Sequence, residues 1–113
     1  MDDGTSARSR LILSVSDQVQ LSPLTRHLES VPGIEVERGA ARTAEGEQGA
    51  MDVLTVVAGS GGLIAAIKVL PEFLRARRSD VTITVALPDE RTITVDVTNV
   101  QDAMAVLERL ING

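Results

Sequence analysis

Four consecutive small residues, Gly59-Ser60-Gly61-Gly62, separate two apolar runs and could carry chemistry. A serine flanked by glycines is typical of a nucleophile turn, and such a serine needs a base that accepts its proton. The chain has one histidine, His27, and no carboxylate is placed to orient it. We therefore interpret His27 as a partly exposed helix residue and keep a serine hydrolase as a less favoured alternative.

The same glycines depart from the common nucleotide-binding motifs. The dinucleotide fingerprint G-x-G-x-x-G requires a third glycine where this chain has Ile64. Lys68 would lie well inside a following helix, away from any phosphate at the helix N-terminus. The simpler interpretation is a bend of small residues that lets two apolar elements approach closely.

Charged residues give no second site. Arg75-Ala76-Arg77-Arg78 precedes Ser79-Asp80, and a basic run at a helix C-terminus is favoured by the helix dipole without any ligand. An anionic partner is the alternative. The carboxylates form neither a pair within an apolar stretch nor a metal-ligand pattern, so we predict no catalytic, cofactor or metal site.

Composition limits the class of protein. The 113 residues suit one domain, with a polar tail over residues 1–7 and a single α+β domain over 8–113. The net charge of −5 and a single aromatic residue argue against binding of nucleic acid. The absence of cysteine is compatible with a cytoplasmic location. The uncharged run of residues 53–67 is too short for a membrane span, but peripheral membrane association through residues 53–74 stays open.

The alternation of apolar and polar residues predicts the elements that would position these groups. The clearest signal is a hairpin of two β-branched strands around the turn Pro88-Asp89-Glu90-Arg91. The other predicted elements are a strand at 10–16, a helix at 21–31, a strand at 34–37, a mobile loop at 39–50, a helix from 63 to 78 and a terminal helix at 98–111. Residues 51–58 fit a strand or a helix, and we favour a helix.

These elements predict an α+β two-layer sandwich in the order β-α-β-α-β-β-α. The sheet would be mixed and four-stranded, with a C-terminal hairpin and with the helices packed on one face. Pro71 should kink or break the helix that follows the glycines. That helix is more apolar than a surface helix requires, so part of it is expected to meet a protein partner or a second copy.

Three stretches resemble one family: RLILSVS, AGSGGLIAAIKVLPEFLRARRSDVTITVALPDERTITVDV and VQDAMAVLERL. They are similar to the effector-associated constant components of actinobacterial conflict systems, over about Arg8 to Ile111. The resemblance implies a small noncatalytic α+β module, encoded beside or fused to an effector such as a caspase-like or trypsin-like peptidase. It also implies a glycine where this chain has Glu90, which leaves open whether that turn takes a positive φ.

The resulting hypothesis is a noncatalytic adaptor or accessory component that acts through protein contacts, with a homo-oligomer as a further possibility. The candidate interface combines the glycine bend, the apolar helix and the basic run. Its residues are Gly59, Ser60, Gly61, Gly62, Leu63, Ile67, Arg75, Arg77, Arg78 and Asp80.

Overall fold

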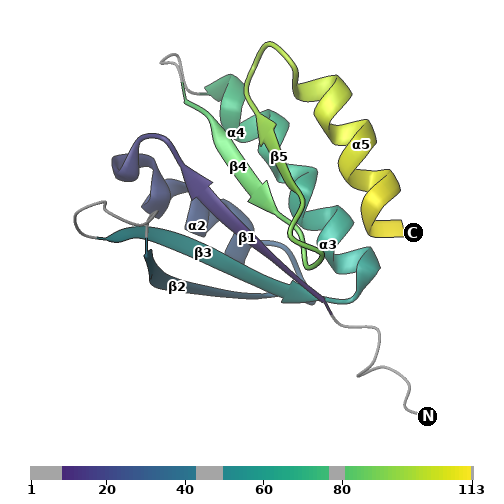
Figure 1. The fold of residues 1–113 in the computed structure, drawn as a ribbon, viewed down its shortest axis with the longest axis horizontal. Helices are drawn as coiled ribbons and strands as arrows, with labels where there is room; N and C mark the ends of the chain where they lie inside the picture. Colours follow the sequence, from purple (N-terminus) through teal and green to yellow (C-terminus); the bar gives the residue numbers. More distant parts are fainter. Residues whose placement is uncertain (1–8, 43–49, 77–80, 113) are drawn as a thin grey trace.

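The computed structural model describes residues 9–42, 50–76 and 81–112. Strands and helices are interspersed along the chain (Figure 1). They are β1 (Ser9–Val15), the short 3-10 helix η1 (Gln18–Gln20), α2 (Leu21–Glu29), β2 (Glu35–Arg42), β3 (Ala50–Ala58), α3 (Ser60–Ile67), α4 (Val69–Ala76), β4 (Ile83–Ala86), β5 (Thr92–Val95) and α5 (Val100–Asn112).

The sheet differs from the prediction in strand number and direction. It has five strands in the order β2-β3-β1-β4-β5, and every neighbouring pair is antiparallel, whereas we predicted a mixed sheet of four strands. The α+β class and the C-terminal hairpin are confirmed. The observed order, β-α-β-β-α-α-β-β-α, has one strand and one helix more than predicted.

The additional strand is β3, where we favoured a helix. Val53, Val56 and Val57 are β-branched residues that suit a pleated strand, and β3 hydrogen-bonds to β1 on one side and to β2 on the other. Such pairing with distant segments decides between strand and helix when a short apolar run fits both. The loop predicted at 39–50 is wrong at both ends, because β2 continues to Arg42 and β3 begins at Ala50, and residues 43–49 lie outside the described residues.

The connectivity of the first part of the chain is that of a ferredoxin-like split β-α-β unit. β1 and β2 are both antiparallel to β3 and therefore parallel to each other, with β3 inserted between them. In the same way β3 and β4 are parallel and flank β1, and α3 and α4 form their crossover. The second strand of the hairpin and α5 extend this unit at the β4 edge (Figure 1).

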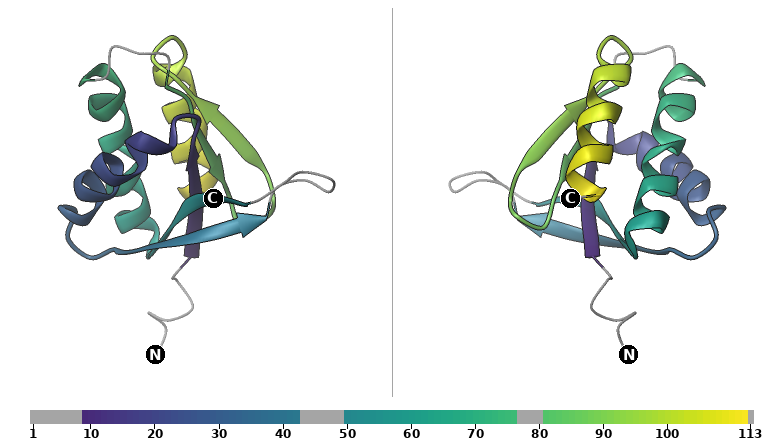
Figure 2. Two further views of the ribbon diagram at one scale, coloured as in Figure 1. Left: turned by 90° about the vertical axis from the view of Figure 1, so that its left-hand side faces the viewer. Right: turned by 90° about the vertical axis from the view of Figure 1, so that its right-hand side faces the viewer.

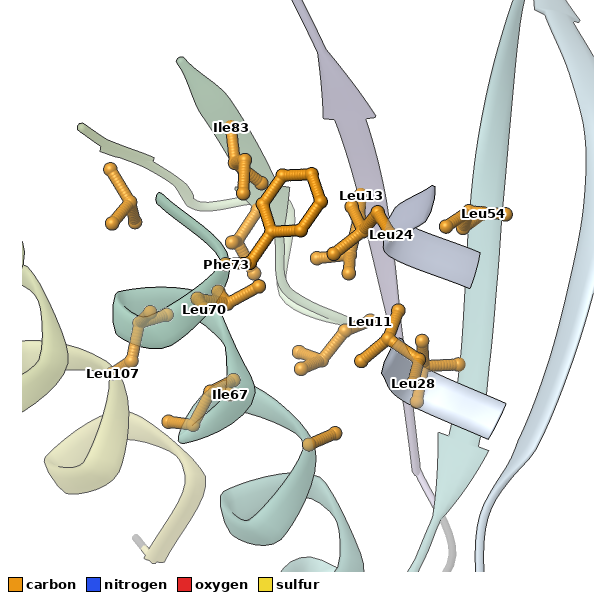
Figure 3. Close-up of a cluster of buried hydrophobic side chains, with 14 of the residues drawn as sticks. Leu11, Leu13, Leu24, Leu28, Leu54, Ile67, Leu70, Phe73, Ile83 and Leu107 are labelled. Atoms are coloured by element: carbon orange, nitrogen blue, oxygen red, sulfur yellow. The ribbon is translucent and has the colours of Figure 1, made fainter. Parts of the chain in front are cut away.

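The core lies on one face of the sheet. Leu11, Leu13 and Val15 of β1 are buried while Ile12 is 36% exposed, so alternate side chains of the central strand point into the core and toward solvent. The helices cover the buried face (Figure 2), as predicted. Phe73 of α4 is fully buried and extends between the strands and the neighbouring helices, beside Leu70 and opposite Leu13 and Leu24 (Figure 3).

The helix that follows the glycines is broken, as Pro71 predicts. α3 ends at Ile67, Lys68 closes its last turn by donating to the Ile64 carbonyl at 3.1 Å, and α4 starts at Val69. Proline has no amide hydrogen and its ring would clash with the carbonyl four residues earlier. In the first turn of a new helix Pro71 avoids both costs.

The terminal helix α5 begins with a reciprocal cap. The Asp96 carboxylate accepts hydrogen bonds from the Thr98 hydroxyl at 2.6 Å and from the Thr98 and Asn99 amides at 3.0 and 3.1 Å. The Asn99 side chain in turn accepts from the Asp96 amide at 2.9 Å. The Thr98 hydroxyl, helped by the two amides, lowers the pKa of Asp96 below its ordinary value of 3.8. The carboxylate is therefore ionised, and its hydrogen bonds are in place, at neutral pH.

The turn of the β4–β5 hairpin has a positive φ at a residue that is not glycine. The Glu90 amide donates to the Leu87 carbonyl at 2.9 Å, and Glu90 itself has φ 75°. Pro88 and Asp89 occupy the central positions of this turn, and Glu90 takes the left-handed conformation that usually belongs to glycine in three-residue hairpin loops. This answers the question that the sequence left open about this turn.

Glu90→Gly should raise the free energy of unfolding by about 1 kcal/mol. The left-handed conformation costs a residue with a Cβ about 1–2 kcal/mol, and glycine avoids this cost. Part of the gain is lost because glycine gives the unfolded chain more conformational entropy. Urea unfolding followed by circular dichroism measures the change. Glu90→Ala is the control, since it removes the carboxylate but keeps the Cβ, and it should leave stability almost unchanged. Equal stabilisation by both variants would mean that the charge, and not the backbone conformation, is unfavourable.

Candidate functional site

The glycine bend joins the end of β3 to the start of α3. Gly59 precedes the helix in an extended conformation, with φ −70° and ψ 173°, and its carbonyl accepts the Leu63 amide at 2.9 Å. A Cβ at Gly62 would lie 2.8 Å from the Ala58 Cβ and 3.2 Å from Ile34 Cγ2. The first contact is shorter than real Cβ atoms show, and the second is tight, so the helix can pack this closely on β3 only with glycine at position 62.

The other two glycines of the bend have no such constraint. A Cβ at Gly59 or Gly61 would meet nothing within 4 Å. Ser60 and Gly61 are exposed in the first turn of α3. The bend thus has one position that requires glycine for packing and a short exposed stretch beside it.

The structure separates the residues of the predicted interface. Leu63 and Ile67 are 2% and 1% exposed and belong to the core, so their side chains are not on the surface of the chain. Arg75 is exposed near the end of α4. At about 1.5 Å per residue, the helix pair α3–α4 is up to roughly 22 Å long from Ser60 to Arg75, so the bend and Arg75 lie at opposite ends of it. Arg77, Arg78 and Asp80 lie outside the described residues.

A groove between α4 and α5 brings Arg75 together with residues from the end of the chain. Its volume is about 430 Å³. Val100, Met104 and Ala105 of α5 and Pro71 of α4 supply apolar surface, and Arg75 and Glu108 add one charge of each sign. The residues that line it, which we call the α4–α5 groove, are Pro71, Arg75, Val100, Gln101, Met104, Ala105 and Glu108.

The comparison with protein families gives a match over most of the chain. The family model described as Effector Associated Constant Component 1 matches residues 14–112. This chain belongs to the Effector Associated Constant Component 1 family. No curated protein and no solved structure matches it.

Membership of the Effector Associated Constant Component 1 family confirms the family resemblance in the sequence. The name describes a component associated with an effector, which is the general role that the resemblance implied. It does not name the effector, and the match covers both helices of the α4–α5 groove and the whole glycine bend.

Ser60 of this Effector Associated Constant Component 1 protein is not hydrogen-bonded to His27 in the described part of the chain. His27 Nδ1 lies 3.0 Å from the Pro23 carbonyl of its own helix, and its ring packs edge-on against Phe73 with 5.5 Å between ring centres. Ser60 instead lines a small hollow of about 140 Å³ between the bend, the hairpin and α5. The imidazole thus serves the packing of α2 on α4.

The apolar segment at 53–74, which left a membrane role open, is divided among β3, α3 and α4. Three of its leucines, Leu54, Leu70 and Leu74, are at most 1% exposed and lie in the core. Within residues 9–42, 50–76 and 81–112, each helix is too short or too polar to cross a membrane. The same residues hold no cluster of His, Asp and Glu side chains that could bind a metal ion.

Sequence reasoning missed the α5 side of the groove. Met104, Ala105 and Glu108 read as ordinary positions of an amphipathic helix, and nothing in their spacing relates them to Arg75, some thirty residues earlier. One signal was present. Val100 and Met104 pack against the core beside Ala103 and Leu107 but stay partly exposed, so the apolar side of α5 is wider than its fully buried part.

Proposed function

We propose that this protein is a noncatalytic accessory component that binds an effector protein through the α4–α5 groove. The observation that carries the proposal is the groove itself, which combines apolar side chains with one basic and one acidic residue. Membership of a family named for its association with effectors supports the kind of partner. We further propose a bacterial conflict or signalling system of actinobacterial type, acting in the cytoplasm, with a caspase-like or trypsin-like peptidase as the effector.

The chemistry of the groove suits a protein segment. Its volume of about 430 Å³ is enough for one or two apolar side chains of a partner. Met104 is flexible and polarisable, and methionine adapts to the shape of the residue it meets. An amphipathic helix laid between α4 and α5 would bury its apolar side chains on Met104 and Val100. Arg75 and Glu108 at the margin would then fix its register through charge.

The proposal keeps part of the predicted interface. Arg75 lines the groove and is the first residue of the basic run, so a partner that binds in the groove would contact this part of the predicted interface. Leu63 and Ile67 support the groove indirectly, because their buried side chains help to hold the helix pair α3–α4 against the sheet. The bend contributes by fixing where this helix pair starts.

Met104→Lys should weaken binding of the effector at least about tenfold, because a lysine would place an unpaired charge on the apolar floor of the groove. Isothermal titration calorimetry against the proteins encoded beside this chain measures the dissociation constant. Val106→Lys is the matched control, since Val106 lies two positions along on the same helix and outside the groove, and it is 36% exposed. Equal weakening by both variants, or no binding of the unchanged protein to any of these partners, would contradict the proposal.

A further inference from the structure

The face of the sheet opposite the helices carries a continuous uncharged patch. The strand registers place Ile12, Val53, Thr55, Val57, Thr84 and Ala86 on this side, and we call these residues the open-face patch. Ile12 is 36% exposed, and the other five are half-buried. Thr92 and Thr94 of β5 extend the patch to the edge of the sheet.

This composition is unusual for a face that meets only water. Charged residues make up 24% of the chain, yet the outward positions of β3, β4 and β5 hold none, and β1 has only Arg10 at its start. The acidic residues lie at one border, where Glu37 of β2 shares a cross-strand row with Thr55 and Ile12. The side of an antiparallel sheet that faces water normally carries polar and charged residues. An uncharged centre with a charged border is the pattern of an interface.

We propose that the open-face patch is a self-association surface, on which a second copy of this chain packs sheet against sheet. The patch is self-complementary in size. Ile12 and Ala86 are direct neighbours in one cross-strand row. A two-fold axis that runs parallel to the strands between β1 and β4 places each Ile12 over the Ala86 of the other copy, so that a large side chain meets a small one twice.

The charged border selects this axis. With a two-fold axis perpendicular to the strands, each β2 would face the other β2, and an axis along the row of Glu37, Thr55 and Ile12 would place Glu37 opposite Glu37. With the parallel axis, β1 lies over β4 of the second copy and β3 over its β5. Each β2 then falls beyond the edge of the other sheet, so Glu37 stays in water. The parallel axis keeps like charges apart, whereas the perpendicular axis brings them together. We therefore favour the parallel axis.

The dimer should form only at high protein concentration. Outward residues are about 4.8 Å apart across strands and about 6.6 Å apart along them, so the patch with its β5 extension covers on the order of 300 Å². A standard interface buries about 800 Å² on each partner. The dimer does not depend on the α4–α5 groove, which lies in the helical layer, and would carry two copies of it.

Sedimentation equilibrium up to about 1 mM protein tests the proposal. The unchanged chain should shift from its monomer mass of 12.0 kDa toward twice that value. Ile12→Lys should raise the dissociation constant at least about tenfold, because two lysines would be buried near the axis. Val106→Lys should leave it within about twofold, since Val106 has the same 36% exposure as Ile12 but lies on α5.

Circular dichroism establishes that each variant is folded, and Thr84→Lys replaces Ile12→Lys if the latter unfolds. A monomer throughout the concentration range would overturn the proposal, and so would a folded Ile12→Lys or Thr84→Lys that dimerises like Val106→Lys. Open-ended growth beyond the dimer would also overturn it, because the two-fold arrangement is closed. A monomer whose binding to the effector is lost with Ile12→Lys would assign the patch to the effector instead.

Discussion

Phe73→Ala should lower the free energy of unfolding by about 4 kcal/mol, the largest effect of any single change we predict. Phe73 is fully buried in α4, and its ring contacts His27 of α2 edge-on at 5.5 Å between centres. It is the one aromatic residue of the chain, so the aliphatic side chains around it cannot replace its volume without a cavity. Urea unfolding followed by circular dichroism measures the change, since the chain has neither Trp nor Tyr for fluorescence.

A loss of this size approaches the whole stability of a small domain, which is about 5–15 kcal/mol. Phe73→Leu is the milder companion and should cost about 1–1.5 kcal/mol, because leucine fills part of the ring's space. Val106→Ala on the surface of α5 should change stability by less than about 0.5 kcal/mol. If Phe73→Ala cost no more than Val106→Ala, the core drawn in Figure 3 would be wrong.

Local patterns in the sequence correctly predicted those strands and helices that have one side in the core and the other side in water. The alternation in the hairpin and in β1 has its period of two because one side of each strand packs on helices, and these elements are confirmed. Residues 51–58 gave a weaker signal, because outward Val53 and Val57 are as apolar as inward Leu54 and Val56. Only the pairing with β1 and β2 identifies this segment as a strand. The fifth strand and the antiparallel sheet follow from it.

Only the part of the candidate site that is one continuous segment of the chain, the glycine bend, could be predicted from the sequence. The bend was located correctly from its composition, but the sequence could not distinguish Gly62, whose neighbours are Ala58 and Ile34, from Gly61, which has none. Leu63 and Ile67 looked like surface because their helix is apolar on several sides, whereas the sheet and α5 use that surface in the core. The groove and the open-face patch depend on which elements become neighbours, and no local pattern contains that information.

We infer that the bend exists for close packing of α3 on β3 and holds no reagent or ligand. Gly62→Ala should destabilise the protein by about 1–2 kcal/mol, because the new methyl group would overlap Ala58 and press on Ile34, and the better helix propensity of alanine offsets only part of this cost. Gly61→Ala adds the same methyl group one position earlier, into open space. It should stabilise the protein by about 0.5 kcal/mol.

The most direct test is therefore the urea midpoint of these two variants, measured together with their affinity for the effector. We predict midpoints that move in opposite directions from that of the unchanged chain, with effector binding retained in every variant that is folded. Gly62→Ala with unchanged stability and abolished binding would show instead that the small residues form a ligand site, and would contradict the inference that they serve close packing.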